Sequence, residues 1–284
     1  AQGMSYIFNH IGNSSEIKIG KDGVGLYLVG TGTANINSKI ELSESDKGTT
    51  IGVYSDGNSN VLFGIGSILN IGKGAVGLYS LDASKFNNTF KIKTGEKLVV
   101  SLGDNSALAL LSGNTNSSIS LKSFLNNNAN DKIEIDSFGS GASLFYVKDG
   151  SKAVLDENYN ITTGGLNSTS VLVGTGSGSK VEISSGKTLK TNTHVGLVAT
   201  DSSTAENSGI LESTRNKGVG VYASQSTAIN STTGAIKMTM DESVGILGEN
   251  NSTLKNSKDI TLLGRSSAGI YGKDSNIEQD TTAK

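Results

Sequence analysis

The sequence predicts an all-β protein, a right-handed parallel β-helix of roughly 10–11 coils with a period of about 24–27 residues. Two observations carry this prediction. A short glycine motif returns at a nearly constant interval, and each interval holds further short stretches in which apolar and polar residues alternate. A fixed period in the twenties is typical of stacked structural repeats, and three short strands separated by turns make up one coil.

The glycine motif has the form Val-Gly-Leu-Tyr, first at Val24–Tyr27. Its glycine-to-glycine steps are 27 and 25 residues in a first group, and 24, 25 and 24 in a second. The motif residues that we assign to the structural repeat are Gly25, Tyr27, Gly52, Tyr54, Gly77, Tyr79, Gly196, Gly220, Tyr222, Gly245, Gly269 and Tyr271.

Stretches in which apolar and polar residues alternate, such as Lys39–Leu42 and Lys180–Ile183, precede the glycine motif. Turn clusters such as Gly174–Gly178 separate the predicted strands. With neighbouring coils about 4.8 Å apart, the rod is on the order of 50 Å long. A hexapeptide β-helix requires a shorter repeat, of six residues. A leucine-rich repeat needs leucines at fixed positions and an asparagine ladder, neither of which we expect here.

Strict alternation assigns the faces of the motif. It places Val24 and Leu26 inside, and Gly25 and Tyr27 outside. Tyrosines on neighbouring coils then form a ladder, each pair worth about 0.5–1.5 kcal/mol beyond area burial, with the ring lying over bare glycine backbone. The opposite orientation, with tyrosine inside, is the alternative, because Val198 and Leu247 occupy the tyrosine position.

We expect one domain over 1–284, as a fragment of a longer chain, with an irregular middle over 82–166 that lacks the glycine motif. The wider spacing there predicts loops at 82–88, 124–131 and 148–163. Loops on a rigid scaffold often carry binding residues, so the candidate ligand-binding residues are Asn126, Asn127, Asn128 and Asp131. The alternative is that these are insertions without a role.

Composition argues against several classes of function. The charged fraction is 18% and the formal net charge is −2, which leaves no basic footprint for nucleic acid. The chain has no cysteine and two histidines, His10 and His194, outside any metal-ligand spacing. We therefore expect no metal and no cofactor.

No catalytic residues are predicted, and we expect that the protein is not an enzyme. The sequence Gly103–Ser106 is interpreted as a turn, because no histidine and aspartate are placed to activate the serine. Carboxylates at Glu41, Glu134 and Glu182 occupy one outward strand position with lysines nearby, the usual pattern of a solvated sheet. A polysaccharide lyase or hydrolase with these carboxylates in a cleft is the alternative.

The repeated Val-Gly-aliphatic-Tyr units, the Asn/Ser/Thr-rich turns and the lack of Cys and Pro resemble the passenger domains of bacterial type V autotransporter adhesins. The large repetitive fusobacterial-type outer-membrane adhesins are the nearest resemblance. It implies a secreted virulence factor, displayed outside the cell by a parent chain anchored in the outer membrane through a C-terminal β-barrel that this sequence lacks. Its implied role is cell adhesion to host or bacterial surface proteins or glycans, through loops or the outer face of a rigid rod. The fragment is expected to be a monomer, and a spacer without a ligand is a further alternative.

Overall fold

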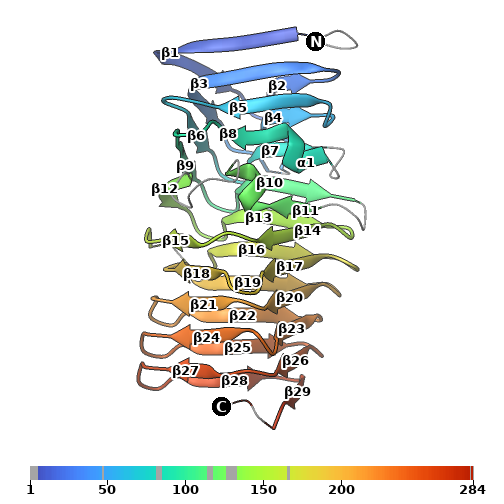
Figure 1. The fold of residues 1–284 in the computed structure, drawn as a ribbon, viewed down its shortest axis with the longest axis vertical. Coiled ribbons are helices and arrows are strands. Elements are labelled where there is room, and N and C mark those ends of the chain that lie inside the picture. The colour runs from blue at the N-terminus through green and yellow to red at the C-terminus, as the bar shows by residue number, and fades with distance from the viewer. Residues whose placement is uncertain are drawn as a thin grey trace.

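The computed structural model is an all-β solenoid of about nine turns, in which parallel strands stack along one axis from the N-terminal to the C-terminal end (Figure 1). It describes residues 6–46, 48–80, 85–113, 118–125, 133–164, 167–281 and 283, with side chains from residue 15 onward. The predicted fold class is confirmed. The number of turns is slightly below the expected 10–11, because the coils of the irregular middle are longer than those of the regular part.

The glycine motifs form one continuous ten-stranded parallel sheet, which we call the motif sheet. Its ten strands give nine circuits of the chain between the first and the last. The strands are β2 (Val24–Leu28), β4 (Ile51–Ser55), β7 (Val76–Ser80), β10 (Ala107–Ser112), β13 (Ser143–Lys148), β16 (Ser170–Thr175), β19 (Val195–Thr200), β22 (Val219–Ser224), β25 (Val244–Glu249) and β28 (Ala268–Gly272).

Two further faces complete each coil. In chain order the second face holds β5 (Ser59–Phe63), β8 (Phe90–Ile92), β11 (Ser118–Ser120), β14 (Lys152–Leu155), β17 (Lys180–Ile183), β20 (Thr204–Asn207), β23 (Thr227–Asn230), β26 (Thr253–Asn256) and β29 (Asn276–Gln279). The third holds β6 (Ile68–Ile71), β9 (Leu98–Leu102), β12 (Ile133–Phe138), β15 (Tyr159–Ile161), β18 (Thr188–Thr191), β21 (Ile210–Ser213), β24 (Ala235–Met238) and β27 (Ile260–Leu262). The long strands β1 (Tyr6–Ile19) and β3 (Gly32–Leu42) run through both faces, because one half of β3 pairs with β5 and the other with β6.

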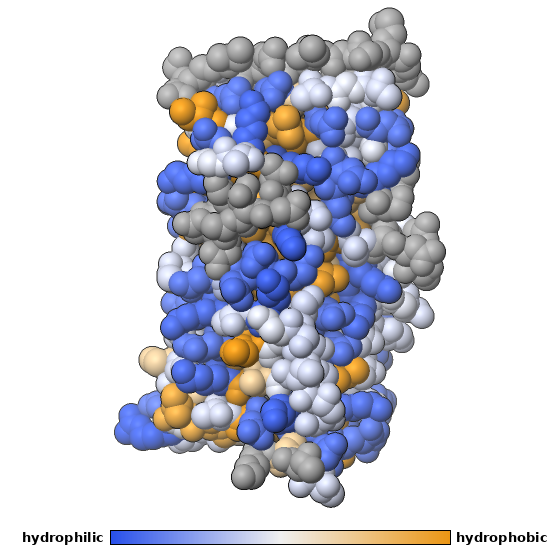
Figure 2. All heavy atoms as spheres, viewed as in Figure 1, coloured by the Kyte–Doolittle hydropathy of each residue, from blue (hydrophilic) through white to orange (hydrophobic). Residues whose placement is uncertain are grey.

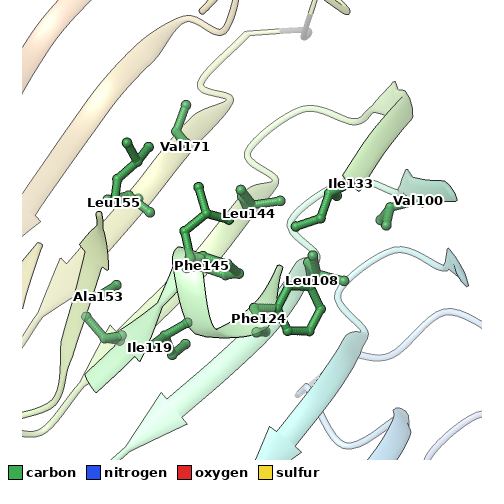
Figure 3. Close-up of a cluster of buried hydrophobic side chains, with 14 of the residues drawn as sticks. Val100, Leu108, Ile119, Phe124, Ile133, Leu144, Phe145, Ala153, Leu155 and Val171 are labelled. Atoms are coloured by element: carbon green, nitrogen blue, oxygen red, sulfur yellow. The ribbon is translucent and has the colours of Figure 1, made fainter. Parts of the chain in front are cut away.

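The irregular middle differs from the loops that the sequence predicted. The helix α1 (Phe86–Thr89) lies where a loop over 82–88 was expected, and α2 (Leu121–Phe124) reaches into the expected loop at 124–131. Both helices carry fully buried phenylalanines. The ring centroid of Phe124 lies 6.3 Å from that of Phe145, edge to face, within the core (Figure 3). The described part of the extra length, in α1 and α2, therefore places side chains in the interior.

The stretch 148–163 was also expected to loop out, and this was wrong. It contains β14 and β15, two ordinary strands of the second and third faces. The coil that contains it has the regular length, since Ser143 pairs with Ser170, 27 residues on; the repeat was missed because β16 has Val171 at the glycine position.

The sheet of the third face is interrupted between β12 and β15. Two side chains bridge the interruption. The hydroxyl of Tyr159 donates to the carbonyl of Ile133 at 3.0 Å, and that of Thr163 to the carbonyl of Ile135 at 2.5 Å.

Strict alternation gave the wrong orientation for the first half of the motif. A Cβ built on Gly77 would lie 2.7 Å from Cδ1 of the core residue Ile71, so this glycine faces inward. In the middle of the chain the same position holds Leu108, Leu144 and Val171, all buried. The third motif residue also faces inward, as Leu78 does. Two inward residues in a row therefore recur in every coil, an irregularity of the strand that we call the motif bulge although the strands pair without a register shift, and the residue before them faces outward.

The three faces give the solenoid the shape of a three-sided prism. Polar side chains of successive coils stack in register at its corners. At the end of the second face, Asn207, Asn230 and Asn256 are buried in one column. The amide of Asn207 donates to Oδ1 of Asn230 at 2.9 Å, and that of Asn230 to Oδ1 of Asn256 at 2.8 Å. The expectation that no asparagine ladder is present was therefore wrong, because the ladder uses single asparagines from three coils and shows only when the register is known.

Candidate functional site

The outer side of the motif sheet carries two parallel rows of apolar side chains, which together we call the contact face. The first row comes from motif position one: Val24, Ile51, Val76, Ala107, Ser143, Ser170, Val195, Val219, Val244 and Ala268. The second row comes from position four: Tyr27, Tyr54, Tyr79, Leu110, Tyr146, Val173, Val198, Tyr222, Leu247 and Tyr271. None of these twenty residues is Lys, Arg, Asp or Glu.

Both rows lie on the outer side of the sheet. In the first coil Val24 is 42% exposed and Tyr27 is 59% exposed, whereas in the later coils most of the first row is covered by its neighbours, as Val195 is at 8%. Further along, residues of both rows line the same surface hollows. The outward orientation of tyrosine is thus confirmed and the tyrosine-inside alternative is wrong. The inward assignment of Val24 is wrong too, since the bulge at Gly25 turns it outward.

The other two faces are held by ion pairs between coils. On the second face Nζ of Lys180 lies 2.8 Å from a carboxylate oxygen of Glu206 in the next coil. On the third face Glu212 bridges Lys190 at 2.9 Å and Lys237 at 3.4 Å, one in each neighbouring coil. On the side of the molecule shown in Figure 2, hydrophilic residues predominate and hydrophobic ones form small separate groups. The two rows of the contact face themselves hold no charged residue, although the next outward position of the motif strands holds Lys148 in β13 and Glu249 in β25.

The tyrosines of the first coils stack as the sequence predicted. The rings of Tyr27 and Tyr54 are nearly parallel, at 8°, with centroids 4.7 Å apart, and Tyr54 and Tyr79 follow at 5.8 Å and 32°. The rings do not cover bare glycine backbone, because the glycines face the core. Burial is the largest cause that raises the pKa of Tyr54, with the neighbouring phenols adding to it, so the phenol of Tyr54 stays neutral at physiological pH.

The tyrosine row is interrupted between Tyr146 and Tyr222, where Val173 and Val198 take its place. These smaller side chains leave a hollow of about 450 Å³, walled by the two tyrosines and closed along one side by Val195 and Val219. The hydroxyl of Tyr222 donates to Oε2 of Glu249 at 3.2 Å, which holds this wall in place. The hollow suits a mainly apolar group, because its lining is mostly valine, leucine and tyrosine, with Ser143 and Ser170 the polar side chains of the first row.

His194 lies at the rim of this hollow, in the turn before β19. Its Nδ1 accepts a hydrogen bond from the backbone N–H of Ser168 at 3.1 Å. Burial is the main cause that lowers the pKa of the ring, and the positive charge of Arg215 adds to this effect. The neutral ring is a structural acceptor. His10 lies in β1, and its side chain is outside the described part of the chain.

The predicted ligand-binding residues Asn126, Asn127, Asn128 and Asp131 lie outside the described residues, so their role stays a prediction. The residues before them are not loop: Phe124 and Leu125 are buried in the core. A deletion that starts at Phe124 would remove core packing as well as the candidate residues. Only substitutions at the four polar positions test them.

The three carboxylates that were expected at one strand position lie on two faces, which corrects that expectation. Glu41 and Glu134 belong to the third face, and Glu182 to the second. All three pair with lysines, Glu134 with Lys97 at 2.6 Å and Glu182 with Lys180 at 2.8 Å, while Glu41 pairs with Lys39. The expectation of a solvated lysine–glutamate surface is confirmed at these positions.

Two carboxylates, Asp241 and Glu242, do share one hollow of about 480 Å³ near the corner between the third face and the motif sheet. Both are paired: Asp241 with the guanidinium of Arg265 at 2.9 Å, and Glu242 with Lys217 at 3.3 Å. Arg265 lowers the pKa of Asp241 through hydrogen bonds from its backbone and side chain. A carboxylate fixed in this way is a poor general acid.

Other sequence candidates are structural. The hydroxyl of Ser106 donates to the carbonyl of Gly103 at 2.7 Å and is buried, which confirms the turn. The carboxylate of Asp56 accepts from the backbone N–H groups of Gly30 and Asn58, both at 3.0 Å. Within the described ranges no group of His, Asp and Glu side chains could hold a metal ion.

Comparison with known proteins leaves the fold as the only classification of this chain, a β-solenoid. No family model, curated protein or solved structure matches it. In the described part of the chain, no helix has the length and apolar character needed to cross a membrane.

Proposed function

We propose that this chain is part of a rod-shaped adhesin passenger of the type V autotransporter kind, which attaches to host-cell or bacterial surfaces through the contact face. The parent protein is then anchored in the outer membrane and displays the rod outside the cell. The observation that carries the proposal is the contact face itself: two uncharged rows that run through all ten strands of the motif sheet, on a prism whose other faces hold ion pairs.

The architecture supports this role in physical terms. Each coil contacts its neighbours through three sets of strand pairings or side-chain ladders, so the solenoid is a rigid rod along which a contact can be repeated. Large continuous apolar surfaces are uncommon on soluble proteins and mark interaction sites. The alternative of a polysaccharide-degrading enzyme needs a free pair of carboxylates, whereas Asp241 and Glu242, which share one hollow, are paired with Arg265 and Lys217.

The test is attachment of protein-coated beads to a panel of host cells and bacteria, with three variants. Val198→Lys places a charge in the hollow of the contact face. The matched control Ile229→Lys places it at an outward strand position of the second face, between Glu206 and Lys255. The third variant carries alanine at Asn126, Asn127, Asn128 and Asp131.

We expect saturable attachment that Val198→Lys lowers at least about tenfold and Ile229→Lys leaves unchanged. If only the alanine variant loses attachment, the binding site lies in the predicted loop and the contact face is not the site. Absence of attachment by the unmodified rod would favour the spacer alternative. Release of sugar fragments from polysaccharides would favour the enzyme.

A further inference from the structure

The sheet of the third face is interrupted between β12 and β15, and we propose that this interruption binds one extended segment of a partner polypeptide. The segment enters as an additional strand between the two. The site lies on a different face from the contact face, so the inference is independent of the proposed function and both can hold together. The chemistry that the site recognises is the peptide backbone itself.

The opening is local to one face of one coil. The strands β10 and β11, which belong to the same coil as β12, pair with β13 and β14 of the next coil. On their other sides β12 pairs with β9, and β15 pairs with β18. No backbone hydrogen bond joins β12 to β15, although both strands are described and follow one another along the same side of the solenoid (Figure 1). Two strand edges therefore face each other where a sheet would ordinarily continue.

The gap has the dimensions of a strand. It is a cavity of about 510 Å³, lined by residues 133–135 of one edge and 159–163 of the other. Five residues of strand are about 17 Å long, so the mean cross-section of the cavity is about 30 Å². A strand takes up about 4.8 Å between its neighbours, which leaves about 6 Å of depth. This is room for a backbone with small side chains, and too little for a helix of about 10–12 Å in diameter.

The edge of β12 is covered by two side chains in place of a strand. The hydroxyls of Tyr159 and Thr163 reach across the gap and donate to the carbonyls of Ile133 and Ile135. The N–H groups of these two isoleucines lie on the same side as their carbonyls, and they find no acceptor in the backbone of β15. An entering strand exchanges two hydroxyl donors for a ladder that also uses the N–H groups, so the exchange gains hydrogen bonds.

The edge of β15 offers the backbone of Asn160. The carbonyl of Ile161 accepts a hydrogen bond from the backbone N–H of Asn192 in the next coil at 3.0 Å, so Ile161 faces β18. Successive residues of a strand direct their backbone groups to opposite neighbours, so the N–H and the carbonyl of Asn160 face the gap. A guest strand can therefore form hydrogen bonds on both of its sides.

A second interruption of the solenoid is already filled. On the second face no ladder joins β8 to β11. There α1 contacts β11 and α2 contacts β8, and Oδ1 of Asn87 in α1 accepts from the backbone N–H of Ser120 at 2.8 Å. Phe86 and Phe124 of these helices are fully buried. The described residues thus fill the gap of the second face, whereas at the third face they leave a cavity.

The surroundings of the gap specify the side chains of the guest. Toward the core the gap is bordered by the buried ring of Tyr159, so inward side chains must be small, such as alanine. On the outer side the carboxylates of Glu134 and Asp136 are exposed. Glu134 pairs with Lys97, whereas Asp136 accepts from the hydroxyl of Ser101 at 3.2 Å and has no cation of the described residues as a partner. A lysine at an outward position of the guest supplies that charge.

The first test uses the peptide acetyl-Thr-Ala-Lys-Ala-Thr-amide, titrated into the isotope-labelled whole chain and followed by the backbone amide signals of Ile135 and Asn160. The matched control peptide is methylated on the backbone nitrogen of both alanines, which removes two donors and keeps every side chain. We expect saturable shifts with the first peptide and an affinity at least about tenfold lower for the second. Equal binding of the two peptides, or no shift at about 5 mM of the first, would overturn the inference.

Two variants of the chain test the edges. Asn160→Pro removes the N–H that faces the gap but none that pairs with β18, and we expect it to weaken peptide binding at least about fivefold, with Asn160→Thr unchanged. Tyr159→Phe removes the hydroxyl that competes for the carbonyl of Ile133, so binding should become about 2- to 10-fold tighter. The Phe variant keeps the test decisive if the Pro variant does not fold. Unchanged affinity in the folded variants would refute the strand site.

Hydrogen exchange of the free chain tests whether the gap is open. The amides of Ile133 and Ile135 should exchange at least about 100-fold faster than that of Glu134, which faces β9, and should slow when the peptide binds. Slow exchange of both isoleucine amides in the free chain would mean that the gap is already closed, and the inference would fall. Attachment through the contact face is measured separately with Val198→Lys, so failure of one does not imply failure of the other.

Discussion

Replacing the inward glycine of the motif is the sharpest test of the bulge. In Gly220→Ala the new Cβ would lie 2.5 Å from the carbonyl oxygen of Gly245 in the next coil and 3.2 Å from Cγ2 of Ile236. The oxygen belongs to backbone held in the sheet, so it cannot move aside without disturbing the strand pairing. Overpacking of this kind costs about 1–3 kcal/mol.

An opposing effect is smaller. Replacing glycine by alanine restricts the unfolded chain and stabilises a protein by about 0.4–1 kcal/mol where the folded backbone accepts a side chain. The net result for Gly220→Ala is a loss of about 1–2 kcal/mol, or about 2–6 °C in melting temperature. Gly269 is the matched control, since it holds the same motif position in β28 but a Cβ there meets nothing within 4 Å. Gly269→Ala is expected to be neutral or slightly stabilising.

Thermal unfolding followed by circular dichroism measures both variants under one set of conditions. The interior variant Gly196→Ala provides a repeat, because its Cβ would lie 2.7 Å from the carbonyl oxygen of Gly220 and 2.8 Å from Cδ1 of Leu211. If Gly220→Ala and Gly196→Ala melt at the same temperature as Gly269→Ala, the glycines do not face the core and the bulge is wrong.

Two further predictions concern the other faces and the corner. Lys190 is the largest cause that lowers the pKa of Glu212. Lys39 is the largest cause that lowers the pKa of Glu16, to about 2. Because the folded-state pKa values are depressed, the stabilisation is present above the usual value of 4.5 and is lost as the pH falls toward 2. The melting temperature should therefore drop across this window, and less steeply in Glu212→Gln; an equal slope would contradict the role of the ion pairs. Asn230→Ala removes the middle of the asparagine ladder, leaves Oδ1 of Asn256 without its donor, and should cost about 2–3 kcal/mol in chemical denaturation, whereas Ser231→Ala at the rim should cost under about 0.5 kcal/mol. Equal costs would contradict a structural role for the ladder.

The regular part of the fold could be predicted from the sequence because particular residues recur once in every coil. Glycine recurs every 24–27 residues, and a side chain that repeats once per coil must stack on its equivalent. The tyrosine stack of Tyr27, Tyr54 and Tyr79 follows from the same reasoning. The turn at Gly103–Ser106 was also predicted correctly, because glycine and asparagine are typical turn residues.

The orientation of the glycine could not be predicted, because alternation assumes that every residue takes one step across the sheet. The bulge breaks this rule between Gly77 and Leu78, and nothing in a Val-Gly-Leu-Tyr sequence distinguishes it from a regular strand. Without the bulge the first row of the contact face was assigned to the core. The apolar residues at motif position one were therefore interpreted as core residues, although they form the first row of the candidate site.

Part of the irregular middle was mispredicted for a related reason. A longer interval between motifs was interpreted as residues looped out into solvent. The buried side chains of Phe86, Phe90 and Phe124 show that residues of this region turn inward and fill a wider coil. Their hydrophobicity was the available signal, since a phenylalanine in a solvated loop loses the free energy of burial.

Hydroxyl-radical footprinting tests most directly whether the contact face makes the contact. The rod is labelled free and bound to a surface that retains it, and the reactivity of individual side chains is compared by mass spectrometry. We expect Tyr146, Tyr222 and Leu247 to lose reactivity on binding, while Met240 and Leu263, which are 43% and 62% exposed outside the contact face, keep theirs. Protection of Met240 or Leu263 with unchanged reactivity of the three contact-face residues would contradict the account.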